Sequence, residues 1–317
     1  MKGQGELRRI NDDVAVIIPL FGAVPHNFRK LIEELQNQEV GEIIIGASAV
    51  SDMPQLQGIA VIGAEQRLTP SSAKNRAAYH ATKKYLLFLD ADNFIGEFAV
   101  VTMRKALEEG NTAIAAAATY YQEDRGRVSF FGASHRHWAG LTRFLSELPP
   151  DASPIPQCSS PKRVVIEVAA NAYMMKRSDF LFIGGFDEVA FPSHFEESDL
   201  SYRVSRSTRK EIICCLDARV YNDMPISVLK RLSAKDPIRS YYNARSRALF
   251  TARHLGVRAW LIYVFAGQFA FYIVYMWSEV RGHGGLKDRL RSIFAYAQGM
   301  FDGVILSRHE LRAKVQI

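Results

Sequence analysis

The sequence predicts an α/β fold: a mixed, mostly parallel sheet with flanking helices, followed by a helical C-terminal extension. Three observations predict it. Short apolar runs alternate with helical patterns over roughly the first hundred residues, which is typical of parallel βαβ units. These runs lack polar interruptions, as expected of strands covered on both faces. After Pro225 the sequence shows successive helical patterns instead.

The individual elements follow from apolar runs and from helix-start signals. The expected strands are Val14–Leu20, Glu42–Ala47, Ile59–Gly63, Tyr85–Leu89 and Ile212–Leu216, with further strand signals across Val164–Met175. Apolar residues recur at helical spacing from Phe28 to Leu35. A second helix is expected from Pro70 to about Lys83, because proline is favoured in the first turn. Ser146–Pro161 holds five prolines and is expected to be a loop.

The C-terminal third is expected to be helical, with helices over 226–234, 236–254 and Ala259–Trp277. The last of these has nineteen residues without a charge, which would span roughly 28 Å as a helix. Three readings stay open for it: a buried helix, a helix lying in the plane of a membrane, and a membrane span. Its aromatic residues are spread along its whole length, which favours the in-plane helix.

The charge is unevenly distributed. The chain of 317 residues has 40 Lys and Arg against 33 Asp and Glu, a net charge of +7. Residues 1–200 hold 20 basic and 25 acidic side chains, a net charge of −5. Residues 201–317 hold 20 basic and 8 acidic side chains, a net charge of +12. A basic C-terminal region suggests an anionic partner, such as a phosphorylated substrate or a membrane surface. No recognition motif for nucleic acid occurs, so none is expected as a partner.

Other function classes lose support. Three cysteines without a CxxC pair predict neither a disulfide framework nor a zinc site. The N-terminal residues lack the apolar stretch of a signal peptide, so we expect a reduced, cytosolic compartment. There is no GxGxxG after the first strand, no P-loop and no GxSxG elbow.

Two acidic constellations can carry chemistry. Asp90-Ala91-Asp92 follows an apolar strand, and two carboxylates at this spacing can hold Mg²⁺ or Mn²⁺ together with a nucleotide. Glu196, Glu197 and Asp199 cluster at a helix start, where one of them can serve as a general base. The alternatives are a solvated turn for the first and a helix N-terminus that favours acids for the second.

An aromatic residue adds a third candidate. Trp138, in the segment SHRHWAG, can form a wall for a sugar acceptor, because aromatic faces stack well on sugars. A tryptophan that fills the core beside a loop is the alternative.

The ordered motifs resemble those of the family 2 glycosyltransferases, inverting enzymes of the GT-A fold. The resemblance covers about Val14 to His254. The matching pieces, in order, are VAVIIPLF, SSAKNRAA, YLLFLDADN, ANAYMMKRSDFLFIGGFDE, FEESDLSYR and YYNARSRALF. Among relatives, the chain looks most like bacterial or archaeal enzymes that add rhamnose-like or other sugars to lipid-linked or polysaccharide acceptors.

The resemblance implies roles for particular residues. It implies a GT-A catalytic domain over 1–225, with a nucleotide-sugar half at about 14–95 and an acceptor half at about 96–225, before the helical region 226–317. Pro19 to Phe21 would line the base pocket, and Lys74 and Asn75 would lie by the nucleotide. Asp90 and Ala91 would contact the nucleotide sugar, and Asp92, with Asp90, would bind the metal. Glu197 would be the base, and Glu196 and Asp199 would lie on the acceptor side.

Two departures from the family pattern stand out. The family usually has an acid after the second strand, where this chain has Gly46-Ala47-Ser48. The family often has a metal-binding histidine after the penultimate strand, where this chain has Asn222-Asp223. Either of these two side chains can still offer an oxygen to a hard cation.

The resulting hypothesis is an inverting single displacement from a nucleoside-diphosphate sugar to a glycan or lipid-linked acceptor. We expect it at the inner face of the cytoplasmic membrane, with peripheral membrane contact through 258–317. An inactive, membrane-associated relative on the same fold is the alternative. A sugar nucleotidyltransferase is less favoured, because FGAVPHN is not its glycine-rich loop.

Overall fold

A computed structural model gives the structure of the chain, and two compact units make it up. It describes residues 11–21, 24–48, 57–63, 68–136, 141–146, 163–169, 171–222, 237–281 and 285–315. The first unit comprises Met1–Gly132, Leu145–Gly185 and Arg203–Asp223, and the second comprises Ala133–Phe144, Phe186–Tyr202 and Met224–Ile317. Each is described by itself. The domain boundary expected at residue 225 stays a prediction.

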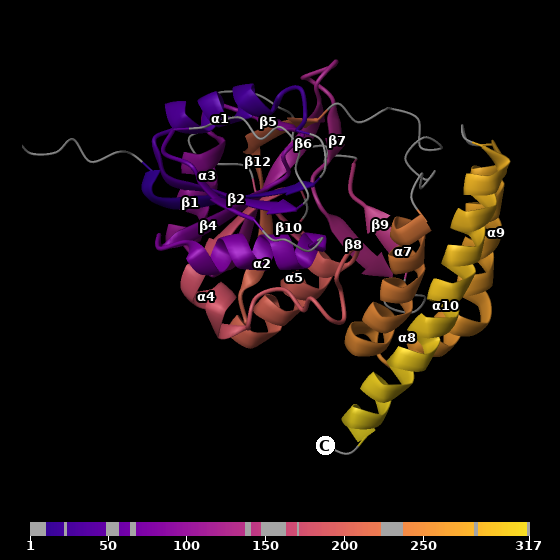
Figure 1. Ribbon diagram of the computed structural model, residues 1–317. Coiled ribbons are helices and arrows are strands. Elements are labelled where there is room, and N and C mark those ends of the chain that lie inside the picture. Colours follow the sequence, from indigo (N-terminus) through magenta and orange to yellow (C-terminus); the bar gives the residue numbers. More distant parts are fainter. Residues whose placement is uncertain are drawn as a thin grey trace, which may run out of the picture. The chain divides into compact units, whose positions relative to one another are not determined.

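The first unit is built on a ten-stranded mixed sheet (Figure 1). Its strands are β1 (Asn11–Phe21), β2 (Val40–Ser48), β3 (Ala60–Ile62), β4 (Tyr85–Leu89), β5 (Asn93–Ile95), β6 (Thr112–Tyr121), β7 (Val128–Phe130), β10 (Arg163–Ile166), β11 (Ala172–Lys176) and β12 (Glu211–Asn222). The main order is β10-β12-β6-β11-β4-β1-β2-β3, with β5 paired to β12 and β7 to β6. This confirms the predicted α/β class with a mixed, mostly parallel sheet.

Helices cover both faces of this sheet. They are α1 (Phe28–Asn37), α2 (Pro70–His80), α3 (Ala99–Glu108) and α4 (Arg177–Phe182), and the second half of α5 (Glu196–Thr208) also belongs to this unit. Alternate residues of β1, such as Val16 and Ile18, join α1 and α3 in one apolar cluster. On the other face, Phe88 of β4 contacts Phe180 of α4, with tilted rings whose centroids are 5.4 Å apart. All of Val14–Ile18 is therefore buried, as its uninterrupted apolar sequence predicts.

Strand direction brings five strand ends to one edge of the sheet. β1 runs parallel to β2 and to β4. β4 and β6 both pair antiparallel with β11, so they run the same way, and β12 runs parallel to β6. The carboxyl ends of β1, β2, β4, β6 and β12 therefore lie along the same edge, which is the ligand-binding edge of open α/β sheets.

The close approach of α2 to the sheet requires a glycine in β2. A Cβ placed on Gly46 would lie 2.3 Å from the carbonyl oxygen of Ala73 in α2. Two residues later, Ser48 Oγ accepts a hydrogen bond of 2.6 Å from the backbone N–H of Leu68. The Gly46-Ala47-Ser48 departure from the family pattern thus has a packing role in this chain.

The second unit combines a short hairpin with helices. The hairpin is β8 (Ala133–Arg136) with β9 (Leu141–Phe144), and the helices are α7 (Pro237–Phe250), the π-helical turn η1 (Thr251–Leu255), α8 (Val257–Ile262), the π-helical turn η2 (Tyr263–Gly267), α9 (Gln268–Arg281) and α10 (Leu286–Val315). α10 packs closely on α7, because Cβ atoms on Gly299 and Gly303 would lie 2.2 and 2.7 Å from carbonyl oxygens of that helix. Tyr275 of α9 stacks on Tyr296 of α10, with ring centroids 4.3 Å apart.

The apolar C-terminal stretch is helical. Val257–Trp277 is long and apolar enough to cross a membrane, judged by its length and composition alone, and 28% of its most apolar window is buried. The helix expected over 226–234 lies outside the described residues, as do Trp138 and nearly all of the proline-rich segment.

Two differences from the expected elements have physical reasons. The strand signal across Val164–Met175 is two strands, β10 and β11, and Asn171 between them has a left-handed backbone with φ of 64°. β6 was not predicted, because TAIAAAATYY is rich in alanine, which favours strands weakly. It is nevertheless wholly buried between β11 and β12, where small side chains fit beneath packed helices.

Candidate active site

The predicted nucleotide-side residues of the first unit gather at the shared sheet edge. Pro19 and Phe21 are near the end of β1, opposite Gly46 and Ser48 of β2. Pro19 is buried and Phe21 is 39% exposed. The Asp90–Asp92 segment leaves β4 at the same edge, and so does Asn222 at the end of β12.

Backbone hydrogen bonds hold the Asp90–Asp92 turn. The N–H of Asp90 donates to the carbonyl of Asn171 (3.2 Å), and the N–H of Asn93 donates back to the carbonyl of Asp90 (3.3 Å). Asp90 is half-buried, Ala91 is buried and Asp92 is exposed. The turn therefore presents one carboxylate to solvent at its tip and keeps a second at its base.

Asn222 lies beside this turn through a buried amide pair. Its Nδ2 donates to Oδ1 of Asn93, at 2.7 Å, where β5 and β12 pair. Asn93 is fully buried, and its own Nδ2 has no hydrogen-bond partner among the described residues. The pairing of β5 with β12 thus places Asn222, the predicted third metal ligand, beside Asn93, which directly follows Asp92.

The oxygen donors at this edge fit a hard divalent cation. No group of three or more His, Cys, Asp or Glu side chains placed to hold a metal occurs among the described residues. Two carboxylates and an amide oxygen nevertheless suffice for Mg²⁺ or a similar ion, which commonly completes its octahedron with substrate phosphates and water. Asp90, Asp92 and Asn222 are the residues that would hold it.

Lys74 and Asn75 lie inside the first unit. Lys74 is 4% exposed and Asn75 is 2% exposed, and both lie on the face of α2 that packs against the sheet. Asn75 Oδ1 would lie only 2.7 Å from a Cβ on Gly185. Asn75 therefore lies against the Gly184-Gly185 turn.

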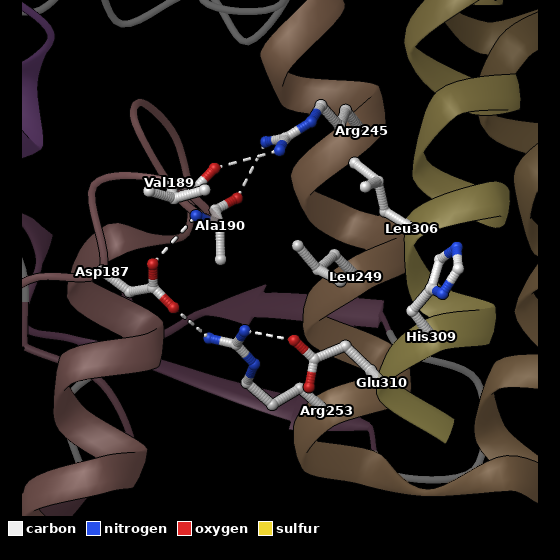
Figure 2. Close-up of a pocket in the computed structure, with 9 residues that line it drawn as sticks. All are labelled: Asp187, Val189, Ala190, Arg245, Leu249, Arg253, Leu306, His309 and Glu310. Atoms are coloured by element: carbon white, nitrogen blue, oxygen red, sulfur yellow. Dashed lines mark hydrogen bonds and ion pairs between the residues drawn. The ribbon is translucent and has the colours of Figure 1, made fainter. Parts of the chain in front are cut away.

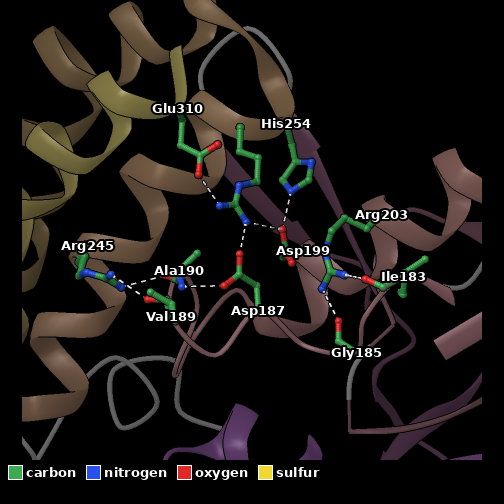
Figure 3. A network of polar contacts seen from close by, with 11 residues as sticks. Ile183, Gly185, Asp187, Val189, Ala190, Asp199, Arg203, Arg245, His254 and Glu310 are labelled. Atoms are coloured by element: carbon green, nitrogen blue, oxygen red, sulfur yellow. Dashed lines mark hydrogen bonds and ion pairs between the residues drawn. The ribbon is translucent and has the colours of Figure 1, made fainter. Parts of the chain in front are cut away.

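That glycine turn is fixed from two helices. Tyr79 of α2 donates from its hydroxyl to the carbonyl of Gly184 (3.1 Å). Arg203 of α5 donates to the carbonyls of Ile183 (2.8 Å) and Gly185 (2.6 Å), as Figure 3 shows. Both glycines have positive φ, so the motif IGG is a left-handed turn anchored at each carbonyl.

In the second unit, the predicted base stands in the first turn of α5. His194 and Phe195 directly before it both have left-handed backbones, with φ of 60° and 65°. Two successive non-glycine residues in this region are unusual, and such strain is often found at functional sites. Glu196 is buried, whereas Glu197 is half-buried. The positive end of the helix dipole favours carboxylates in this turn.

Burial and nearby cations lower the pKa of His194 strongly. Burial, together with the positive charges of Arg239 and Arg247, lowers the pKa of His194 to about 3. Its Nε2 is buried without a hydrogen-bond partner among the described residues. The ring is therefore neutral at physiological pH.

α7 holds the segment that leads into α5. Arg245 donates to the carbonyls of Ala190 (2.8 Å) and Val189 (3.0 Å). Ser246 donates to the carbonyl of Ser193 (3.2 Å), and the Arg247 guanidinium lies 5.2 Å from the ring centroid of Phe195. These three successive residues give the NARSRA segment a structural role in this chain.

Asp199 is part of a buried charge network. Its side chain is fully buried, and Oδ1 accepts from His254 Nε2 (2.8 Å) and Arg253 Nη1 (3.4 Å). Arg253 also pairs with Asp187 (2.7 Å) and with Glu310 of α10 (Figure 2). Burial opposes the charge of Arg253, but the hydrogen bonds that Arg253 donates to Glu310 and Asp187, with the charge of Asp199, raise its pKa above the ordinary value. Asp199 thus fixes α5 within the second unit and reaches no solvent.

A pocket of about 450 Å³ lies next to this network, between the loop Asp187–Ala190, α7 and α10 (Figure 2). Leu249 and Leu306 supply apolar walls, and His309 stands at the side of α10. The two arginines that line it, Arg245 and Arg253, are already bonded to protein groups.

Sequence reasoning missed several residues of these sites. Asn93 and Asn171 fix the Asp90–Asp92 turn, and Arg253 and His254 fix Asp199. Asn93 stands directly after Asp92, so its position in LDADN was a usable signal. The other three act over separations that no local pattern reveals. Trp138 lies outside the described residues and stays a prediction, as do the roles of the other site residues.

One family model matches the N-terminal part of the chain. Residues 15–148 match the family model described as glycosyl transferase family 2. No curated protein matches the chain.

Solved structures share the fold at low identity. The mannosyltransferase PcManGT from Pyrobaculum calidifontis, in complex with GDP-Man and Mn²⁺, has a TM-score of 0.53 at 14% identity, over 94% of this chain and 86% of that one. S. aureus TarS 1-349 in complex with UDP-GlcNAc has a TM-score of 0.52 at 14% identity, over 91% of this chain and 90% of that one. GalNAc-T7 with UDP, GalNAc and Mn²⁺ has a TM-score of 0.53 at 13% identity, over 82% of this chain and 56% of the GalNAc-T7 chain. The chain thus spans just over half the length of the last.

Proposed function

We propose, for a chain whose residues 15–148 match the model of glycosyl transferase family 2, an inverting transfer of a sugar. The donor is a nucleoside-diphosphate sugar, and the acceptor is a hydroxyl of a glycan or a lipid-linked molecule. The observation that carries the proposal is the meeting of the Pro19–Phe21, Asp90–Asp92 and Asn222 segments at one edge of the sheet.

The donor side rests on the first unit. Phe21 offers an exposed aromatic face at the end of β1, which suits stacking on a nucleotide base. Asp90, Asp92 and Asn222 would hold a Mg²⁺ or Mn²⁺ ion, and that ion would neutralise charge on the diphosphate leaving group. The structures of PcManGT and GalNAc-T7 contain Mn²⁺ and support this assignment.

The acceptor side rests on the first turn of α5. Glu197 accepts the proton of the attacking hydroxyl as the general base, from the first turn of the helix. The bond from the hydroxyl oxygen to the anomeric carbon forms as the bond to the diphosphate breaks on the opposite face. The configuration at that carbon therefore inverts.

Asp199 is assigned a positioning role rather than direct contact with the acceptor. Its carboxylate is fully buried and is bonded to Arg253 and His254. It fixes the turn of α5 that carries Glu197. Glu196 is also buried, so Glu197 is the more accessible of the two adjacent carboxylates.

The test is turnover of nucleotide sugars by wild type, Glu197→Gln and Glu197→Asp. We expect Glu197→Gln to lower kcat by about 10²-fold or more with donor affinity retained, because only the proton acceptor is lost. Glu197→Asp should keep part of the activity, since its carboxylate is withdrawn by about 1 Å. Glu211→Gln is the control, because Glu211 is exposed at the start of β12, on the opposite sheet edge.

Two results would overturn the proposal. A folded wild type that binds and turns over no nucleotide sugar would indicate an inactive relative. Formation of a nucleotide sugar from a sugar phosphate and a nucleoside triphosphate, with release of pyrophosphate, would indicate a nucleotidyltransferase.

A further inference from the structure

The C-terminal helices of the second unit expose many large apolar side chains. Eight lie on α8, η2 and α9: Val257, Leu261, Ile262, Phe265, Phe269, Ile273, Val274 and Trp277. Five lie on α10: Leu286, Leu290, Phe294, Phe301 and Ile305. Phe265, Phe294 and Phe301 are 79%, 71% and 67% exposed. Apolar surface of this extent marks an interaction site.

The exposed residues form two stripes. Phe265, Phe269, Ile273 and Trp277 recur every four residues, and so lie along one side of their helix. On α10, Leu290, Phe294, Phe301 and Ile305 are four, seven and four residues apart, which again is one side of a helix. We call these eight residues the apolar stripes.

The opposite sides of the same helices are packed inside the unit. Ser292, Tyr296, Gly299, Gly303 and Ser307 are the buried line of α10, and the two glycines lie against α7. On α9, the Tyr275 hydroxyl is 2.6 Å from Ser240 Oγ of α7. The apolar stripes are therefore not an unused part of the core, because the core side is already occupied.

Positive charge flanks both stripes. Arg258 precedes the first stripe. Lys287 precedes the second, Arg291 directly follows its first residue, Leu290, and Arg308 follows its last; all four basic residues are exposed. Residues 292–307 contain no Lys or Arg and one acid, Asp302, which accepts a hydrogen bond from Tyr241 (2.8 Å). Residues 281–317 hold seven basic and three acidic side chains, a net charge of +4.

From this arrangement we infer that the apolar stripes dock on the surface of an anionic lipid bilayer. The aromatic and aliphatic side chains enter the boundary between headgroups and acyl chains, and the flanking Arg and Lys bind the negative headgroups. A second copy of the chain is a less suitable partner for the apolar stripes. The stripe on α10 is basic at both ends, with Lys287 before it and Arg308 after it, so pairing two copies of that stripe in either direction places positive charge against positive charge.

The packing also distinguishes docking from crossing. Trp260 donates from Nε1 to Ser307 Oγ of α10 (2.7 Å), and Tyr275 is bonded to α7. A span by Val257–Trp277 would have to break these contacts or take α7, with Arg245 and Arg247, into the hydrocarbon. The helices therefore lie in the plane of the interface.

The test is cosedimentation of the full chain with vesicles of phosphatidylcholine, alone or mixed with phosphatidylglycerol. We expect binding to the mixed vesicles that weakens as salt rises. The variant F265S/F269S/F294S/F301S should bind at least about tenfold more weakly. The control F98S/F182S removes equally exposed rings, 64% and 75%, from the first unit and should bind like wild type.

A second variant and two further measurements complete the test. K287Q/R291Q/R308Q should lose most of the salt-dependent binding while leaving the apolar stripes intact. Failure of wild type to bind mixed vesicles, or wild-type binding by both variants, would overturn the inference. A dimer that only the four-phenylalanine variant loses would assign the surface to a second copy. Resistance to extraction by alkaline carbonate would assign a span. The readout is lipid binding, so it is independent of sugar transfer.

Discussion

Gly184 and Gly185 show how two adjacent glycines can be required for different reasons. Both have left-handed backbones, with φ of 77° and 69°. A Cβ on Gly184 would meet nothing within 4 Å, whereas one on Gly185 would lie 2.7 Å from Asn75 Oδ1 and from Tyr79 Oη. Gly184 is therefore required only for its conformation, and Gly185 also for space.

This difference predicts unequal costs of substitution. Gly184→Ala should lower the free energy of unfolding by about 1 to 2 kcal/mol, the cost of a left-handed alanine. Gly185→Ala should cost about 1 to 3 kcal/mol more, because a side chain is forced against α2. Denaturant unfolding of the two variants measures both. Equal costs would contradict the packing of Asn75 on this turn.

His194 predicts how stability depends on pH. Its folded pKa of about 3 is below the ordinary value of 6.5, so between these values the unfolded chain binds more protons than the folded one. The histidine's contribution is complete above about pH 6.5 and is lost as the pH falls toward 3, by at most about 1.4 kcal/mol per pH unit.

The check is a pair of unfolding curves from pH 7 to pH 4 for wild type and His194→Asn. Asparagine tolerates the left-handed backbone but does not titrate. The difference in unfolding free energy between the two proteins should shrink as the pH falls. A difference that stays constant with pH would show that His194 is not buried as a neutral ring.

At the scale of elements, α5 depends on contacts from distant helices. α7 fixes the segment before it through Arg245, Ser246 and Arg247, and η1 fixes its buried face through Arg253 and His254. A helix was expected over 236–254, and the structure has α7 followed by a π-helical turn that contains both residues. Figures 2 and 3 show that Asp187 and Glu310 belong to the same network.

Two carboxylates that share Arg253 should differ in importance according to their burial. Asp199→Asn should lower the free energy of unfolding by about 3 kcal/mol or more, because it removes, at a fully buried position, the carboxylate that accepts from both Arg253 and His254. Glu310→Gln should cost about 1 kcal/mol or less, since Glu310 is 29% exposed and water replaces the lost partner. Thermal or denaturant unfolding gives both values. A larger cost for Glu310→Gln would reverse the assigned hierarchy.

At the scale of the whole molecule, the direction of the strands brings together the residues that we propose for the donor side. The ends of β1, β4 and β12 are about seventy to two hundred residues apart in sequence, yet share one edge because β4 and β6 both run opposite to β11. A nucleoside diphosphate with Mn²⁺ bound at this edge should raise Tm, by an amount set by its concentration relative to Kd.

The metal-dependent part of that rise should depend on Asp92. In Asp92→Asn, the shift with nucleoside diphosphate alone should persist, and the further shift on adding Mn²⁺ should be largely lost, because an amide replaces the exposed carboxylate ligand. Glu211→Gln should behave like wild type in both measurements. An unchanged Mn²⁺ effect in Asp92→Asn would place the cation elsewhere.

Much of the fold could be predicted because its signals are local. The apolar run Tyr85–Leu89 is β4 as expected, and Pro70 opens α2 behind a Thr69 capping box. The helical spacing from Phe28 to Leu35 is α1, whose buried residues are those that recur in the pattern. β6 was not predicted from the sequence, because its run of alanines shows neither the period of a strand nor that of a helix.

The sequence by itself determined the α/β class, the placement of Asp90 and Asp92 at a strand end, and the basic, aromatic character of the C-terminal helices. These depend on residue order and period, which a single chain displays directly. Only the tertiary structure decided that Asn222 lies beside Asn93, that Asp199 is buried against Arg253 and His254, and which side of α9 and α10 is exposed. Those facts depend on strand pairing and helix packing between distant segments, which no local pattern encodes.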